Sequence, residues 1–94
     1  MDRQQTCELI GAELQRQGAT RVAVFGSFAR GDDSRTSDID ELVAFRSVKS
    51  LFQLVKIEQY LSERLGRKVD LVPQDSISPL LRPHIEKDLE ILRS

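Results

Sequence analysis

Apolar residues recur along this chain at two spacings, three to four positions in some segments and two in others. Helical spacing begins in residues 5–18, where one face of a predicted helix carries Cys7, Ile10 and Leu14. It returns after Ser50-x-x-Gln53, which has the form of a capping box, and continues to Gly66, a residue suited to end a helix. From Pro83 onward, the same spacing predicts a last helix with Ile85, Leu89 and Leu92 on its apolar face.

Short β-rich runs lie between these helices. They are "TRVAVFGS" at residues 20–27, "DIDELVAF" at 38–45 and "RKVDLVP" at 67–73. The predicted order is therefore helix, strand, turn, strand, helix, strand, helix. This order predicts one α/β (α+β) domain over residues 1–94, with a small mixed sheet of about three strands flanked by helices.

Composition narrows the classes of protein that the chain can belong to. Fourteen basic residues face fifteen acidic ones in 94 residues, so the basic excess typical of general nucleic-acid binding is missing. The apolar runs are far shorter than the roughly 20 residues that cross a bilayer, and the first residues do not form a signal peptide. One cysteine, Cys7, excludes an internal disulfide. We therefore expect a cytoplasmic protein without a membrane segment.

Two aspartates open the second predicted strand. Since side chains alternate along a strand, Asp38 and Asp40 point to one side, and Ile39 points to the other. Carboxylates about 4 Å apart repel by roughly 4 kcal/mol near a protein surface, and a divalent cation removes that repulsion. Oxygen ligands of this kind suit Mg²⁺, and two such ions are expected at a carboxylate cluster that serves phosphate chemistry.

Three further residues complete a candidate site. Gly26 follows the first strand and permits a close approach of backbone to ligand, and Ser27 offers a hydroxyl group to a phosphate. Asp70 lies within the third strand, where an acid is unfavourable unless its face opens to a cleft. An Asp-x-Asp alone is usually a solvated strand edge. Together with a Gly-Ser turn and an acid in the third strand, this motif favours nucleotidyl transfer.

These segments, "GSFARGDDSRTSDIDELVAF" and "GRKVDLV", resemble the minimal nucleotidyltransferases (MNT proteins) of the DNA polymerase β superfamily. The resemblance implies the DNA polymerase β-like nucleotidyltransferase fold. It implies that Gly26 and Ser27 bind the triphosphate of ATP, and that Asp38, Asp40 and Asp70 are catalytic and bind Mg²⁺. It also implies an antitoxin that transfers AMP to a tyrosine of a HEPN-domain ribonuclease toxin, with which it would form a hetero-oligomer.

Two residues need a separate explanation. Glu41 stands where the resembled family has an apolar residue, so we expect either a more exposed strand there or a pair with Arg21, Arg46 or Lys68. Arg30 is expected to hold the following loop through Asp38 or Asp33, with phosphate contact as the alternative.

Two other functions also fit the sequence. A non-catalytic antitoxin, a binding module that neutralises its partner by complex formation, suits a small domain with a limited core. Transfer to a small molecule is disfavoured, because a single small domain offers no second domain to build an acceptor pocket.

Overall fold

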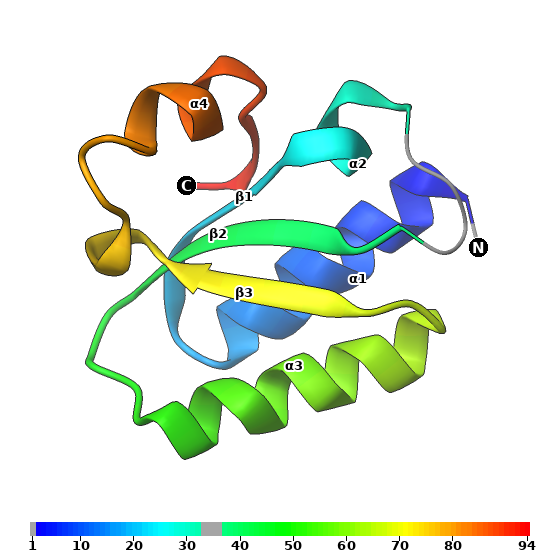
Figure 1. Ribbon diagram of the computed structural model, residues 1–94. Coiled ribbons are helices and arrows are strands. Elements are labelled where there is room, and N and C mark those ends of the chain that lie inside the picture. Colours follow the sequence, from blue (N-terminus) through cyan, green and yellow to red (C-terminus); the bar gives the residue numbers. More distant parts are fainter. Residues whose placement is uncertain (1, 33–36) are drawn as a thin grey trace.

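A four-stranded mixed sheet forms the centre of the computed structural model, which describes residues 2–32 and 37–94. The strands are β1 (Ala19–Phe25), β2 (Ile39–Phe45), β3 (Val69–Pro73) and β4 (Glu90–Arg93). They lie in the order β3-β2-β1-β4, where β1 is antiparallel to β2 and β4, and β2 is parallel to β3 (Figure 1). The sheet therefore has β3 and β4 at its two edges and β2 and β1 inside.

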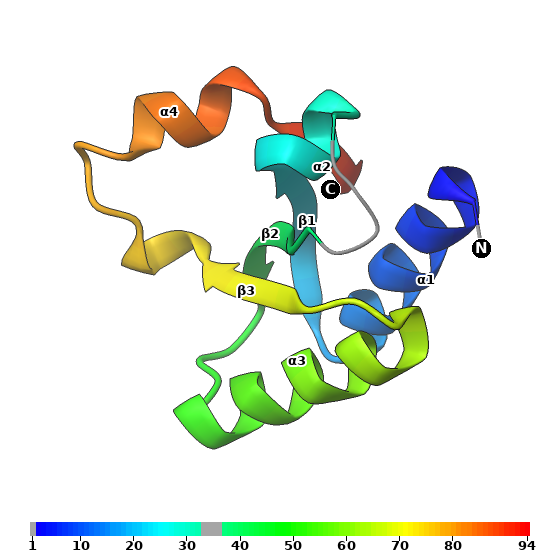
Figure 2. The same cartoon turned by 45° about the vertical axis from the view of Figure 1, so that its right-hand side comes forward.

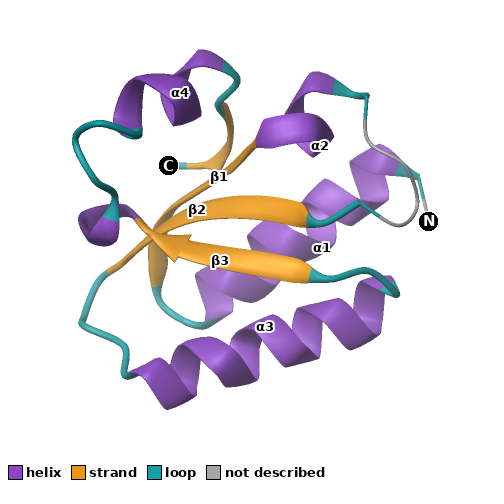
Figure 3. Ribbon diagram, in the orientation of Figure 1, coloured by secondary structure: helices purple, strands orange, loops and turns teal. Residues whose placement is uncertain are grey.

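Helices lie on both sides of this sheet. In the described residues they are α1 (Arg3–Arg16), α2 (Gly26–Arg30), α3 (Leu51–Leu65) and α4 (Arg82–Lys87), with the 3-10 helix η1 (Gln74–Ser76). The helices α1 and α3 lie together on one side, and α2 and α4 lie toward the other (Figure 2). Seen as in Figure 3, α1 lies behind β2 and β3. On the opposite face, Leu42 is buried and lines a small hollow with residues of η1 and α4, whereas Asp40 and Asp70 are only half-buried.

The hydrophobic core lies between the sheet and the pair α1 and α3. Its fully buried side chains alternate along the strands and meet residues of both helices, among them Ile10, Leu14, Leu61, Val22, Val24, Ile39 and Val43. Cys7 is partly buried against the same cluster. The predicted apolar faces of the first two long helices are therefore confirmed.

The predicted ends of α3 are also confirmed. The Ser50 hydroxyl accepts a hydrogen bond from the backbone of Gln53 at 3.2 Å, and the Gln53 side chain accepts one from the backbone of Ser50 at 2.8 Å. Gly66 ends the helix in the left-handed region, with φ +67°. These reciprocal bonds satisfy donors that the first helical turn leaves free.

The last helix is shorter than predicted. It ends at Lys87, and the chain then forms β4 beside β1, so Leu92 belongs to a strand and the sheet gains a fourth member. The apolar spacing of Ile85, Leu89 and Leu92 fits a helix, but β1 has an edge whose backbone groups require partners. Pairing with that edge overrides the local helical pattern.

The outer edge of β3 is closed by side chains of α3. The backbone N–H of Val69 donates to the Ser62 hydroxyl at 2.9 Å, and that of Leu71 donates to a Glu58 carboxylate oxygen at 2.7 Å. The next residue of β3 whose backbone nitrogen points away from the sheet is Pro73, which has no N–H. The donors of this edge are therefore satisfied without another strand.

No helix in the described part of the chain is long and apolar enough to span a membrane.

Candidate functional site

Two of the predicted acids lie side by side at one end of the sheet. Asp40 of β2 and Asp70 of β3 are directly paired in the parallel register. Neighbouring strands are about 4.8 Å apart, so the two side chains leave the same face of the sheet as neighbours. Asp38 immediately precedes β2 and is exposed, and both Asp40 and Asp70 are half-buried. The predicted position of Asp70 within a third strand is confirmed.

Asp38, Asp40 and Asp70, which we call the acidic corner, place like charges near one another. Burial raises the pKa of the Asp40 carboxyl, and the nearby charges of Asp70 and then Asp38 raise it further. Lys68 pairs with Asp70 at 3.7 Å (Nζ to Oδ1), but this pair is largely exposed to solvent and is therefore weak. A positive ion beside Asp40 would relieve the unfavourable charge.

Gly26 brings backbone directly against Asp40. A β-carbon built at residue 26 would lie 2.7 Å from Oδ2 of Asp40, and Gly26 has φ +72°. Both facts favour glycine, since other residues rarely adopt this conformation and a β-carbon would displace the Asp40 carboxylate. The register explains the contact, because Phe25, the last residue of β1, is paired with Asp40. Ser27 follows in the first turn of α2 and is half-buried.

The donor set fits Mg²⁺ when phosphate oxygens and water complete its shell. Among residues 2–32 and 37–94, no three His, Cys, Asp or Glu side chains form a group that can hold a metal ion by itself. Asp40 and Asp70 form a pair, and Asp38 lies within electrostatic reach of Asp40. Mg²⁺ is commonly bound through one or two carboxylates together with substrate phosphates, so this pair is a suitable anchor.

Arg67 supports this corner, although no pattern in the sequence indicates it. Its guanidinium donates two hydrogen bonds to the carbonyl of Ser37, from Nε at 3.2 Å and from Nη2 at 3.0 Å. The same guanidinium lies 5.4 Å from the centre of the Phe28 ring, on α2. Arg67 thus links the residue before Asp38 to α2, the helix that begins at Gly26. Thirty positions separate Arg67 from Ser37, so local spacing offers no signal for the contact.

Arg30 has the predicted structural role, but with other partners. It pairs with Asp88 at 3.0 Å and with Asp32 at 3.2 Å, and so joins α2 to the residue after α4. The predicted pair with Asp38 is wrong, because Arg30 lies at the end of α2 that faces α4. The predicted alternative Asp33 lies outside the described residues.

Both expectations for Glu41 are wrong. The side chain is fully buried, and neither carboxylate oxygen has a hydrogen-bond partner in the described structure. Burial raises the pKa of Glu41 well above its usual range, and Glu58 and Asp40 raise it further. Glu41 lies in the middle of an inner strand, on the face that α1 and α3 cover. Arg21 instead reaches Gln74, at 3.4 Å, and so is not available as a partner.

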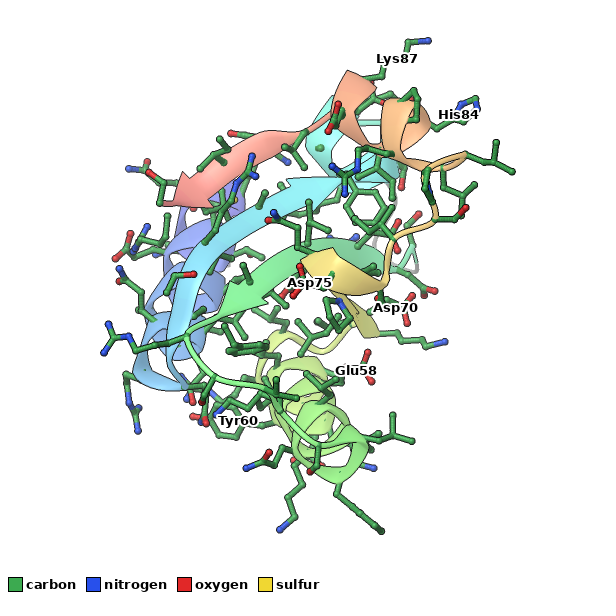
Figure 4. All side chains as sticks on the ribbon, turned by 90° about the vertical axis from the view of Figure 1, so that its left-hand side faces the viewer. Glu58, Tyr60, Asp70, Asp75, His84 and Lys87 are labelled. Carbon is green, nitrogen blue, oxygen red and sulfur yellow. The ribbon has the colours of Figure 1, made fainter. Side chains whose placement is uncertain are left out.

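His84 and Lys87 point outward from α4 into solvent (Figure 4). His84, the single histidine of the chain, therefore does not join the acidic corner.

Comparison with known proteins places these features in a wider group. Residues 7–92 match the family described as nucleotidyltransferase domain. A candidate protein adenylyltransferase of Methanocaldococcus jannaschii is 46% identical over 72 residues, which are 77% of each chain. The solved structure of a candidate minimal nucleotidyltransferase is 34% identical and has a TM-score of 0.80, covering 96% of this chain and 95% of that one. A crystal structure of a toxin–antitoxin with AMP-PNP is 27% identical, has a TM-score of 0.75, and covers 86% of this chain and 68% of that one.

Proposed function

Since this chain belongs to the nucleotidyltransferase domain family, we propose that it is a Mg²⁺-dependent adenylyltransferase that modifies a protein. In this proposal residues 1–94 act as one minimal cytoplasmic domain. It transfers AMP from ATP to a tyrosine of a HEPN-domain ribonuclease toxin and thereby acts as the antitoxin.

The observation that carries the proposal is the strand register that pairs Asp40 with Asp70. Asp40 lies beside Asp70, and Gly26 approaches Oδ2 of Asp40 so closely that a β-carbon at residue 26 would have to displace the carboxylate. The raised pKa of Asp40 shows that its charged form is unfavourable in its half-buried position beside Asp70. Such a pair becomes favourable where it binds cations together with a triphosphate.

We assign each residue of the site a role on this basis. Asp38, Asp40 and Asp70 would hold two Mg²⁺ ions, and Gly26 and Ser27 would hold the triphosphate through the backbone and the hydroxyl group. When bound, the metal ions would neutralise phosphate charge and favour the ionised form of the attacking hydroxyl.

The reaction is a substitution at the α-phosphorus of ATP. The tyrosine oxygen bonds to that phosphorus, the bond between the α-phosphorus and the bridging oxygen breaks, and pyrophosphate leaves. Asp70 would accept the proton of the tyrosine hydroxyl at a carboxylate oxygen. Gly26 and Ser27 would orient the triphosphate so that the leaving group points away from the acceptor.

Two comparisons support the acceptor and the nucleotide. The relative from M. jannaschii is named as a candidate protein adenylyltransferase, and the toxin–antitoxin structure contains AMP-PNP, an analogue of ATP. The tyrosine and the HEPN class of the toxin rest on the resemblance of the "GSFARGDDSRTSDIDELVAF" segment.

A non-catalytic antitoxin is the second candidate. It is favoured by the group of exposed apolar side chains at the start of α3, a surface suited to a stable complex.

One experiment separates the two functions. The purified chain is incubated with a purified HEPN toxin encoded beside it, with ATP and Mg²⁺, and the intact mass of the toxin is measured. Catalysis predicts a mass gain of one AMP group per modified tyrosine, and the Asp38→Asn/Asp40→Asn double variant should abolish it. Asp75→Asn, which changes an exposed acid of η1, serves as the matched control and should retain transfer. No mass gain on a folded toxin, with full neutralisation by the double variant, would establish the second candidate instead.

A further inference from the structure

Large apolar side chains are exposed where the chain leaves β2 and enters α3. Their exposed fractions are 98% for Val48, 76% for Leu51, 82% for Phe52 and 39% for Val55. We call these four residues the α3 patch. Val55 lies three positions after Phe52 and four after Leu51, and residues at these two spacings neighbour one another on a helix surface. Contiguous exposed apolar groups of this kind mark interaction surfaces.

The surroundings of the α3 patch are basic. Residues 46–57 contain Arg46, Lys49 and Lys56 and no acid. On one side a hollow of ≈ 360 Å³ is lined by Lys49, Lys56 and the ring of Tyr60, among others. Its acid, Glu13, is already bound to Arg16 at 3.2 Å. The net charge on this side of the apolar surface is therefore positive, whereas Glu58 and Glu63 lie with Lys68 around a hollow on the side of Val55.

On the other side lies a second hollow of ≈ 470 Å³, between the segment before α3 and the 3-10 helix η1. Phe45, Val48, Leu54 and Pro73 give it apolar walls, and Asp75 of η1 also lines it. Figure 4 views this region from the side of Asp75 and Tyr60, where the start of α3 faces the viewer. A hollow beside an apolar surface can receive a side chain of a partner.

The α3 patch is remote from the acidic corner. Asp40 lies near the start of β2 and the patch follows its end at Phe45, so five residue steps along the strand, roughly 17 Å, separate Asp40 from that end. The two places also lie at opposite ends of β2 in Figure 1. A ligand on the α3 patch leaves Asp38, Asp40 and Asp70 accessible.

The charges select one kind of occupant. A second copy related by a two-fold axis would bring Lys49 and Lys56 against the same lysines, which is unfavourable. A membrane surface would require more basic residues along the exposed side of the helix, whereas Glu63 is exposed further along α3. An acidic amphipathic helix satisfies both the apolar residues and the lysines.

We propose that the α3 patch, with Lys49 and Lys56, is a docking surface for an acidic amphipathic helix of the protein that this chain modifies. The inference rests on the proposed function in one respect, namely that the acceptor is a protein. Binding far from the reacting phosphorus holds the acceptor near the site and lowers the concentration at which it is modified.

The test uses a defined probe and the whole chain. A 20-residue helical peptide with Leu at positions i, i+3, i+4 and i+7 and Glu on the remaining face is titrated into the ¹⁵N-labelled protein. A peptide of the same pattern with Lys in place of Glu is the charge control. We expect the acidic peptide to shift amide signals of residues 45–56. We expect Phe52→Asp to raise the Kd of the peptide by about tenfold or more. Leu80→Asp, at an 84% exposed residue outside the patch, should leave the Kd unchanged.

The role of the lysines is tested by comparing the double variant Lys49→Glu/Lys56→Glu with Lys87→Glu on α4. Only the first variant should weaken binding. Equal binding of both peptides, signals shifted away from residues 45–56, or equal effects of Phe52→Asp and Leu80→Asp would overturn the docking surface. Binding to phosphatidylserine vesicles that Phe52→Asp abolishes, or self-association that it abolishes, would assign the patch to a membrane or to a second copy instead.

The outcome is distinguishable from the outcome for catalysis. Docking is measured with the peptide alone, without ATP, whereas catalysis is measured as AMP transfer. If transfer fails while the peptide binds at the patch, the docking surface is supported and the proposed reaction is refuted. If the protein transfers AMP and Phe52→Asp leaves the KM for the acceptor protein unchanged, the reaction is supported and the docking surface is refuted.

Discussion

Gly26 and Asp40 are in such close contact that a single methyl group at residue 26 would meet Oδ2 of Asp40 at 2.7 Å. The contact joins the end of β1 to the acid at the start of β2. It fixes the position of the carboxylate from the backbone side.

Gly26→Ala should therefore both destabilise the fold and displace Asp40. We expect a loss of about 1–3 kcal/mol in the free energy of unfolding, measured by urea denaturation, because the alanine is strained and crowded. Gly31→Ala is the matched control. Gly31 has a similar φ of +81°, but a β-carbon added there would meet no atom within 4 Å, so its cost is that of the backbone alone, about 1–2 kcal/mol. Equal losses in stability and equal activity for the two variants would contradict the contact.

Asp40→Asn should abolish the response of the protein to Mg²⁺. The wild-type protein carries like charges at Asp40, Asp70 and Asp38, so Mg²⁺ with an ATP analogue should raise its Tm. The variant removes one charge, so it should be at least as stable as the wild type without metal, and it should lose the increase in Tm. Thermal unfolding followed by circular dichroism measures both. An undiminished Mg²⁺ response in the variant would show that the ion binds elsewhere.

Glu41→Leu should stabilise the protein, and the gain should depend on pH. Because the pKa of Glu41 is raised in the fold, its stability contribution is fully present below its unfolded pKa of about 4.5 and is lost as pH rises through the higher folded value. The variant should gain about 1–3 kcal/mol at pH 7.5, as expected when an unsatisfied buried group is removed. The gain should shrink at pH 4. Urea denaturation at the two pH values measures it, and a gain that is larger at pH 4 would refute the explanation.

Arg67→Ala should lower transfer while the fold is retained. The variant loses both hydrogen bonds to Ser37 and the contact with Phe28, so Asp38 is less well positioned. We expect kcat to fall by about ten- to a hundredfold, with a smaller change in the KM for ATP. Arg64→Ala, at an exposed arginine of α3 that bonds Tyr60, is the control and should keep kcat. An equal fall in kcat for both variants would mean that Arg67 has no special role in positioning.

Local patterns predict those parts of the fold that local chemistry determines. The capping box at Ser50, the end of α3 at Gly66 and the strand position of Asp70 all follow from residues within a few positions of one another. Parallel pairing of β2 and β3 places Asp40 beside Asp70, but the sequence could not settle the direction of these strands. The sequence predicts a cluster of acids, and only the structure shows its register.

Long-range contacts account for what local patterns miss. The strand after Lys87 forms because β1 offers an unpaired edge, which no spacing within the last residues reveals. The carboxyl group of Glu41 is buried because tertiary packing, rather than the identity of the residue, determines which face of β2 is covered. Arg67 reaches Ser37 only once α3 and β2 are packed together.

The satisfied backbone of β3 has a consequence for assembly. Since Ser62 and Glu58 occupy the outward N–H groups of Val69 and Leu71, and Pro73 has none, a strand of another molecule finds no donors there. Growth of the sheet on this side into a ribbon of many copies is therefore disfavoured. A small domain of this kind can therefore be kept at high concentration without polymerising through β3, and association is directed to side-chain surfaces instead.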